Sequence, residues 1–351
     1  MEKKTTYHEQ KDVENILRLR EVLSTLPPFC RDYFRAIDTT TTTKTRISYA
    51  YDIRIFFQFL LDENPAFKDY KMTDFTVDVL DQIKALDLEE YQEYLKVYQA
   101  GDKTETNGER GLKRKISALR SFYAYYYRRE MIETNPTVLI DVPKIHDKSI
   151  IRLDTDEVAL LLDYIEHCGD QLTGQKRVYY EKNKERDLAI VTLLLGTGIR
   201  VSECVGLDIE DVDFKNNGIK VTRKGGNEMV VYFGPEVEKA LKNYLEVRKK
   251  IIPVEGHENA LFYSAQRRRI GVQAIENLVK KYAQQITTTK KITPHKLRST
   301  YGTALYQETG DIYLVADVLG HKDVNTTKKH YAAIDDARRR QAAKAVKLRE
   351  D

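Results

Sequence analysis

The sequence predicts a mainly α-helical protein with two domains and one small antiparallel β-sheet in the second domain. At 351 residues the chain is longer than one ordinary hydrophobic core allows. Apolar residues recur at helical spacing, for example Tyr49, Ile53, Phe56, Phe57 and Leu60. The stretch GIKVTRKGGNEMVVYF instead places two strand-like runs around a Gly-Gly pair, which is typical of a hairpin.

The expected first domain, residues 1–137, is helical. Helices are predicted over about 11–25, 41–62 and 108–129, and the threonine run before the second offers residues that cap a helix. The helix 108–129 has one apolar stripe and a largely basic remainder. A solvated face explains such charge, and a basic face can also lie along DNA phosphates. A proline-containing linker over 138–150 separates this domain from residues 151–351.

The second domain is expected to begin with a helix whose capping box uses Asp154 and Glu157. An apolar helix follows and is expected to stop at Gly196 and Gly198. After the hairpin, helices are predicted around 272–282, from the Thr293-Pro294 pair onward, and from about 311 to a C-cap at Gly320.

Composition restricts the class of protein only in part. The net charge is +4, and three scattered cysteines, Cys30, Cys168 and Cys204, form neither a metal spacing nor a disulfide framework. The N-terminus lacks the apolar region of a signal peptide, and no apolar run approaches the ~18 residues of a spanning helix. We therefore expect a cytoplasmic protein with no membrane association.

Four separated stretches of the second domain carry side chains suited to a phosphodiester. Arg200 follows a glycine-rich turn, Lys224 lies at the hairpin tip, and His295 and Arg298 share one helix face. His321 and Tyr331 lie in LGHKDVNTTKKHYAAI. Taken singly, each is more often a surface or structural residue. Together they form a cationic set without paired carboxylates for Mg²⁺, which favours phosphoryl transfer stabilised by side-chain cations and no cofactor.

The order of these residues and the phrases LLLGTGIRVSEC, VTRKGGNE, TPHKLRST and LGHKDVNTTKKHYA resemble the tyrosine recombinase (phage integrase) family, and most closely its Xer recombinases of the XerS-like type. The resemblance covers about residues 40–340. Ser299 departs from it, because the family often has a second histidine there. Lys220 competes with Lys224 for the position of the catalytic lysine.

The resemblance implies a helical, SAM-like core-binding domain and an α+β catalytic domain that clamp DNA in a C shape. It implies Tyr331 as the nucleophile that forms a 3′-phosphotyrosine, Arg200 and Arg298 on the nonbridging oxygens, and Lys224 as general acid. His295 would deprotonate the tyrosine or bind the phosphate, and His321 would donate a hydrogen bond.

The implied partners are double-stranded DNA, three further copies in a tetramer on two DNA sites that exchanges C-terminal helices, and the DNA motor FtsK; the implied location is the nucleoid. The residues expected to contact DNA in the first domain are Lys44, Arg46, Lys113, Arg114, Lys115 and Arg120. The leading hypothesis is resolution of chromosome dimers at a dif-like site. The alternatives are the integrase or excisionase of a phage, conjugative transposon or other mobile element, a type IB topoisomerase, and a catalytically silent DNA-binding protein.

Overall fold

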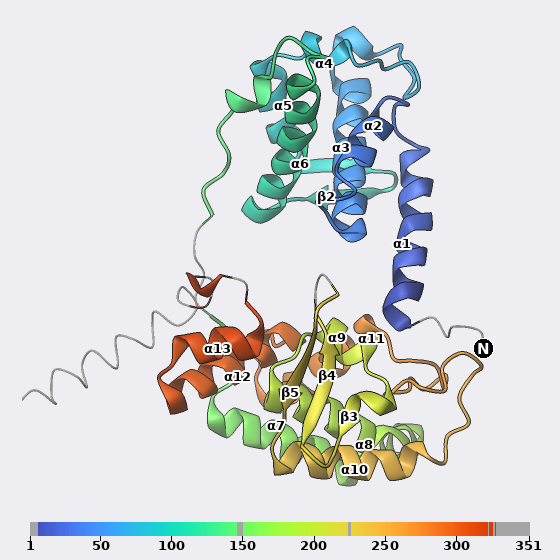
Figure 1. Ribbon diagram of the computed structural model, residues 1–351, viewed down its shortest axis with the longest axis vertical. Helices are drawn as coiled ribbons and strands as arrows, with labels where there is room; N and C mark the ends of the chain where they lie inside the picture. Colours follow the sequence, from blue (N-terminus) through green and yellow to red (C-terminus); the bar gives the residue numbers. More distant parts are fainter. Residues whose placement is uncertain (1–5, 146–149, 224–225, 322, 326, 328–351) are drawn as a thin grey trace, which may run out of the picture. The chain divides into compact units, whose positions relative to one another are not determined.

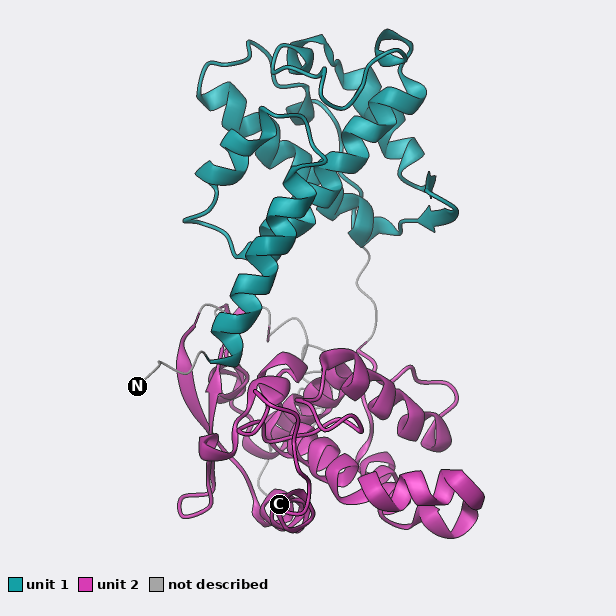
Figure 2. Ribbon diagram, turned by 90° about the vertical axis from the view of Figure 1, so that its right-hand side faces the viewer, with its two compact units in different colours: residues 1–148 teal, residues 149–351 magenta. Residues whose placement is uncertain are grey.

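The computed structural model describes residues 6–145, 150–223, 226–321, 323–325 and 327. The chain forms two compact units, Met1–Lys148 and Ser149–Asp351 (Figure 2). Most described elements are helices, and the strands form two small antiparallel sheets. The predicted fold class, mainly helical with a small antiparallel sheet, is confirmed.

Unit 1 is a helical bundle (Figure 1). Its elements are α1 (Tyr7–Leu23), α2 (Cys30–Ala36), α3 (Thr43–Glu63), η1 (Pro65–Phe67), α4 (Val79–Gln82), α5 (Ala85–Tyr94), β1 (Val97–Ala100), β2 (Lys103–Thr106), α6 (Glu109–Arg128) and η2 (Pro136–Val138). Thr42 caps α3 by accepting from the Thr45 N–H at 3.3 Å, as expected for the threonine run. The β1–β2 hairpin was not predicted, because its strands are short and almost wholly exposed.

The core of unit 1 is aromatic and lies between α3 and α6. Phe56 and Phe57 of α3 and Phe122, Tyr123 and Tyr126 of α6 are fully buried. Their rings meet mostly edge to face, for example Phe57 and Phe122 at 6.3 Å between centroids. The buried tyrosine hydroxyls find backbone acceptors, such as that of Tyr126 on the Phe29 carbonyl at 2.9 Å. This packing fixes the two long helices that carry all six predicted DNA-contacting residues.

Unit 2 surrounds a central buried helix. Its elements are α7 (Thr155–His167), η3 (Cys168–Gln171), α8 (Gly174–Thr197), α9 (Val201–Gly206), η4 (Ile209–Asp211), β3 (Val212–Asp213), β4 (Gly218–Thr222), β5 (Glu228–Tyr232), α10 (Pro235–Arg248), α11 (Val272–Ile286), α12 (Pro294–Thr309) and α13 (Ile312–Leu319). The second half of α8 is buried on nearly all sides and packs against α7, α10 and α12. The sheet order is β3-β4-β5, with Ile219 paired to Val231.

The predicted helix boundaries in unit 2 are largely confirmed. The Asp154 N–H donates to Glu157 Oε2 at 2.8 Å, which is the expected capping interaction of α7. Gly320 ends α13 in the left-handed conformation, with φ of 62°. Gly196 does not stop α8, and that prediction was wrong. The residue lies inside the helix, where a Cβ would stand 2.4 Å from Val237 Cγ2 of α10, so glycine serves close packing there.

None of the described helices has both the length and the apolarity to cross a membrane. Tyr331 and the tail beyond residue 334 lie outside the described residues, as does the Gly225 end of the hairpin turn.

One stability prediction follows from a buried ion pair in unit 1. Lys115 is 6% exposed and its ammonium lies 3.4 Å from Asp52, which also pairs with Arg114. Burial raises the pKa of the Asp52 carboxyl, and both cations oppose that rise. We expect Lys115→Ala to lower the free energy of unfolding by about 2 kcal/mol or more in urea titrations at pH 7.

The exposed neighbour Lys113 supplies the control, since Lys113→Ala should cost less than about 0.5 kcal/mol. The loss from Lys115→Ala should shrink as the pH falls through the pKa of Asp52, because a protonated carboxyl needs no cation. Equal effects of the two substitutions would contradict this account.

Candidate functional site

Arg200 is held at the start of α9 by the glycine turn that ends α8. Gly198 is left-handed, with φ of 63°, and a Cβ there would lie 2.4 Å from Tyr301 Cδ1 and 3.0 Å from Leu319 Cδ2. Only glycine meets both conditions without strain. The turn therefore brings α8 against α12 and α13 and directs Arg200 toward the end of α13.

A buried carboxylate fixes the Arg200 side chain. Glu203, 4% exposed, accepts from the Arg200 backbone N–H at 2.8 Å and from Arg200 Nη1 at 2.7 Å. The remaining Nη2 donates to the Gly320 carbonyl at 3.3 Å. Arg200 stays about one-third exposed, so part of its guanidinium is open to solvent.

Arg298 on α12 joins the same two segments from the buried side. It is 4% exposed and donates to the carbonyls of Gly198 and Leu319. Pro294 begins this helix and fits the first turn, where its missing N–H costs nothing. His295, one turn before Arg298, is exposed, so the two side chains predicted to share a face differ in depth.

A third arginine, which was not predicted from the sequence, completes the arrangement. Arg223, at the end of β4, donates from Nη2 to the Val318 carbonyl at 2.7 Å. Its Nε and Nη1 are buried and lack a hydrogen-bond partner among the described residues. Burial lowers its pKa, with Arg200 acting in the same direction and Glu203 opposing. A Cβ on Gly320 would stand 1.2 Å from Arg223 Nη1, so this approach also requires glycine.

Three successive carbonyls at the end of α13 thus receive three different arginines. Val318 accepts from Arg223, Leu319 from Arg298 and Gly320 from Arg200. The last carbonyls of a helix have no partners within it and carry its negative dipole end, so guanidinium donors suit them. One buried carboxylate, Glu203, balances the three charges only in part.

His321 follows this turn directly. Its backbone N–H donates to the Ala316 carbonyl at 2.9 Å, and its Nδ1 lies 2.7 Å from Oγ1 of the fully buried Thr327. A hydroxyl six residues later therefore orients the ring, and His321 directly follows the Gly320 carbonyl that Arg200 contacts. The structure brings together Arg200, Arg298 and His321 of the predicted set, with His295 at the start of α12.

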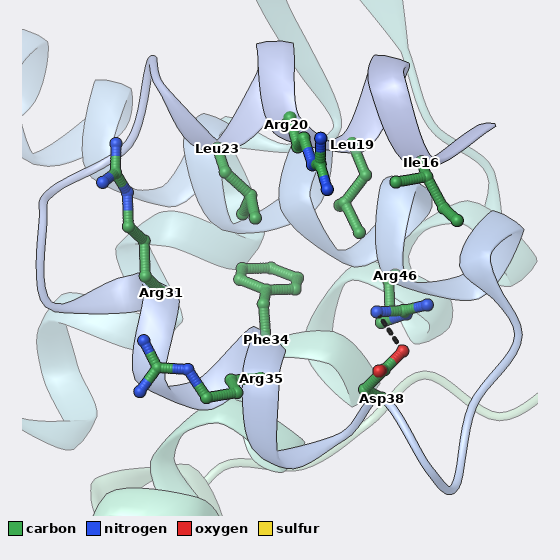
Figure 3. Close-up of a pocket in the computed structure, with 9 residues that line it drawn as sticks. All are labelled: Ile16, Leu19, Arg20, Leu23, Arg31, Phe34, Arg35, Asp38 and Arg46. Carbon is green, nitrogen blue, oxygen red and sulfur yellow. Dashed lines mark ion pairs between the residues drawn. The ribbon is translucent and has the colours of Figure 1, made fainter. Parts of the chain in front are cut away.

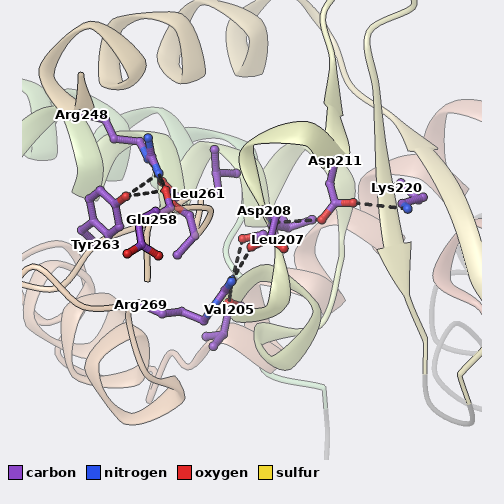
Figure 4. Close-up of polar contacts among 11 residues, drawn as sticks. Val205, Leu207, Asp208, Asp211, Lys220, Arg248, Glu258, Leu261, Tyr263 and Arg269 are labelled. Atoms are coloured by element: carbon purple, nitrogen blue, oxygen red, sulfur yellow. Dashed lines mark hydrogen bonds and ion pairs between the residues drawn. The ribbon is translucent and has the colours of Figure 1, made fainter. Parts of the chain in front are cut away.

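Lys224 and Tyr331 lie outside the described residues. The competing lysine, Lys220, is half exposed on β4, and its ammonium lies 3.7 Å from Asp211 (Figure 4). The same ammonium lies 3.6 Å from Glu228. Carboxylates thus flank the Lys220 ammonium on both sides.

A separate polar network contacts the C-terminal end of α9. Arg269 donates to the carbonyls of Val205 and Leu207 at 3.0 and 2.8 Å and pairs with Asp208 (Figure 4). Arg248 joins the same loop region by donating to Tyr263 Oη at 2.6 Å. These contacts hold the C-terminal end of the short helix whose first residue follows Arg200.

The predicted DNA-contacting residues of unit 1 have different surroundings. Lys44, Lys113 and Arg114 are exposed, although Arg114 also pairs with Asp52. Lys115 is buried, and Arg120 donates to the carbonyls of Thr137 at 3.1 Å and Ile140 at 2.7 Å. Arg46 pairs with Asp38. Contacts within unit 1 thus engage Arg46, Arg114, Lys115 and Arg120, of which Arg114 remains exposed.

Glu203 and Arg223 were not among the residues predicted from the sequence. Glu203 had a signal in its capping-box spacing three residues after Arg200. Arg223 had none beyond its place beside Lys224, because its contact with residue 318 depends on how the hairpin packs. No group of three or more His, Cys, Asp or Glu residues in the described part of the chain could hold a metal ion.

A cluster of arginines with histidine beside it, fixed by one carboxylate and partly open to solvent, defines an anion-binding site with the donors that a phosphodiester needs. The chain belongs to the tyrosine recombinase family, because residues 152–338 match the sequence model described as "Phage integrase family". It is accordingly a site-specific DNA recombinase.

Two Xer recombinases align with most of this chain. Tyrosine recombinase XerS of Lactococcus lactis subsp. cremoris (strain MG1363) is 31% identical, with 92% of this chain and 96% of that protein covered. Tyrosine recombinase XerC of Caldanaerobacter subterraneus subsp. tengcongensis is 32% identical, with 90% and 86% covered.

Solved structures share the fold. The Tn1549 transposon integrase in complex with circular intermediate DNA has a TM-score of 0.63 at 20% identity, with 89% of this chain and 98% of that chain covered. The XerH recombinase bound to difH substrate gives 0.60 at 21% identity, with 86% and 78% covered.

The glycine turn yields a prediction for this site. We expect Gly198→Ala to lower the free energy of unfolding by about 3 kcal/mol, because it adds a left-handed alanine and a collision with Tyr301. Gly256→Ala is the matched control: its φ is 82° but nothing lies within 4 Å of the new Cβ, so it should cost about 1 kcal/mol. Thermal and urea unfolding of the two variants measure the difference, and equal losses would contradict the close packing at Gly198.

Proposed function

We propose that this recombinase resolves chromosome dimers at a dif-like site through a 3′-phosphotyrosine intermediate. The observation that carries the proposal is the convergence of Arg200 and Arg298 on one turn, next to His321. The match to Xer relatives at about 31% identity over most of the chain favours the Xer role. Integration of a mobile element is the second candidate, supported by the fold shared with a transposon integrase.

In the proposed reaction the phenolate oxygen of Tyr331 attacks the scissile phosphorus. A bond forms between phosphorus and the tyrosine oxygen, and the bond to the 5′ oxygen breaks. Lys224 gives the leaving oxygen its proton, and His295 either accepts the phenol proton or binds the phosphate. The reverse attack by a 5′-hydroxyl rejoins the strand and needs no ATP, because the phosphodiester energy is kept in the covalent intermediate.

The arginines would stabilise the negative charge that develops on the nonbridging oxygens. Arg200 has the partly exposed guanidinium and would engage one oxygen bidentately, while Arg298 would donate from the buried side. His321 would donate to the same phosphate from the ring nitrogen not held by Thr327. Glu203 would keep Arg200 in position, and Arg223 would support the turn. In the apo protein these donors are occupied by carbonyls, so the phosphate would exchange with them.

Around this site we propose two domains, 1–137 and 151–351, joined by the linker 138–150 and closing as a clamp on duplex DNA. Lys44, Lys113 and Arg114 are exposed and would contact phosphates from unit 1. Four copies would assemble on two DNA sites and exchange C-terminal helices in the nucleoid of the cytoplasm. A DNA motor such as FtsK would control the reaction.

The nucleophile is tested with a nicked duplex that traps cleavage, carrying a site selected from random DNA by binding and cleavage. We expect the unmodified protein to form an SDS-resistant adduct. Tyr331→Phe should bind the duplex within about twofold of normal and form none, because no phenolate oxygen remains.

Tyr313→Phe is the control, since Tyr313 is 71% exposed on α13 and should be dispensable. An adduct formed by Tyr331→Phe would refute the assignment and direct attention to Tyr301, Tyr306 and Tyr313.

The choice between the two biological roles needs a separate experiment. A plasmid with two directly repeated copies of the host's dif-like palindrome should be resolved into two circles by the protein and its host motor. If the protein fails to resolve this plasmid but resolves one whose repeats are the ends of a mobile element, the integrase alternative is favoured.

A further inference from the structure

Arg223 at the end of β4 carries donor groups that no described residue satisfies. Its Nη2 donates to the Val318 carbonyl at 2.7 Å, but its Nε and Nη1 are buried without a hydrogen-bond acceptor among the described residues. Nearly all buried donors in folded proteins are paired, because an unpaired buried donor costs free energy. Two such donors on one guanidinium are typical of a functional site whose ligand supplies an acceptor.

Arg46 of unit 1 provides a comparison. Its Nε is also buried without an acceptor in the described part of the chain, but its Nη1 pairs with the Asp38 carboxylate (Figure 3). The other arginines that line the same pocket are exposed, so water can accept from their donors. Arg223 differs from all of them, because the described acceptor that it contacts is a neutral carbonyl. Its positive charge therefore has no carboxylate partner among the residues that the structure describes.

Both the backbone and the side chain of Arg223 are held in place. Its backbone N–H donates to the Asn227 carbonyl at 2.8 Å, one residue beyond the last β4–β5 pair, Thr222 with Glu228. Its side chain is tied to α13 by the Val318 carbonyl. The unpaired donors therefore cannot turn freely toward solvent. Donors that are fixed before a ligand arrives stabilise developing charge without a cost of reorganisation.

One of these unpaired donors lies at the turn that Arg200 contacts. A Cβ on Gly320 would overlap Arg223 Nη1, so this nitrogen lies against the glycine backbone. The carbonyl of the same glycine accepts from Arg200 Nη2 at 3.3 Å. Burial lowers the pKa of Arg223, Glu203 opposes that change and Arg200 adds to it. Two guanidinium groups thus repel each other at one turn, and a bound anion would relieve the repulsion.

We infer that Arg223 is a third arginine of the phosphate site and donates from Nη1 to a nonbridging oxygen of the scissile phosphate, an assignment that rests on the proposed function. In the free protein Arg223 supports the turn through Val318. When the phosphate displaces the carbonyls held by Arg200 and Arg298, it also gives Arg223 an acceptor that the described residues lack. A third guanidinium adds to the stabilisation of the charge that develops on the phosphate.

Single-turnover cleavage by the full-length protein tests this role. The nicked duplex carries at the scissile position either the ordinary phosphate or a methylphosphonate, whose two diastereomers each replace one nonbridging oxygen with a methyl group. We expect Arg223→Met, which keeps an unbranched side chain, to lose at least about 30-fold in cleavage of the ordinary phosphate. The same variant should cleave at least one methylphosphonate within about threefold of the unmodified protein, because the charge that Arg223 stabilises is absent.

Arg269→Met is the matched control. Arg269 also donates to two carbonyls at a helix end, those of Val205 and Leu207, but it belongs to the separate network at the end of α9. Its replacement should reduce cleavage of the phosphate and of both methylphosphonates by the same factor. Arg223→Lys should recover at least about fivefold of the activity that Arg223→Met loses, because lysine keeps the charge without the planar guanidinium. Circular dichroism melting verifies that each variant folds.

Two results would overturn the assignment of Arg223 while leaving the proposed function intact. One is cleavage of the ordinary phosphate by Arg223→Met at the normal rate. The other is an equal loss on the phosphate and on both methylphosphonates, as expected for Arg269→Met, which would mean that Arg223 only caps α13. A different result, no adduct of the unmodified protein with the ordinary phosphate, would refute the proposed function and the role of Arg223 with it.

Discussion

The site depends on the capping of α13 by arginines from three other segments. Each of the last carbonyls, on Val318, Leu319 and Gly320, accepts from a guanidinium contributed by the hairpin, by α12 or by the α8–α9 turn. These carbonyls would otherwise be unsatisfied at the negative end of the helix. The same contacts bring three guanidinium groups together at the end of α13. The hydrogen bonds that cap this helix therefore also form an anion-binding site.

Two glycines and one carboxylate allow the three arginines to converge on the end of α13. Gly198 and Gly320 both adopt left-handed backbone, and a side chain on either would collide with a neighbour that forms the site, Tyr301 or Arg223. Glu203 then fixes the direction of Arg200 from a buried position. In the proposed reaction, phosphate oxygens take over donors that carbonyls hold in the free protein. Binding DNA and loosening the end of α13 would therefore be linked.

The helices and several of their ends were predictable from the sequence, because they depend on interactions between residues close together in the chain. The helices follow from apolar spacing, the α7 start from the Asp154–Glu157 box, and the α13 end from Gly320, because caps and stripes act within a few residues. What depends on packing between distant segments was not predictable. Arg223 reaches a carbonyl 95 positions later, Gly196 accommodates Val237 of another helix, and Lys115 turned out to be buried against Asp52. The β1–β2 hairpin was missed because exposed short strands leave no hydrophobic pattern.

The central claim is that Arg200 serves the charge of the scissile phosphate. The most direct measurement replaces one nonbridging oxygen of that phosphate with a methyl group, which removes the negative charge, and compares cleavage by the unmodified protein and by Arg200→Ala. If the account is right, Arg200→Ala loses at least about 100-fold in cleavage of the ordinary phosphate but cleaves the neutral methylphosphonate at nearly the rate of the unmodified protein. An equal loss on both substrates would show that Arg200 maintains the fold of the turn and does not act on the phosphate charge.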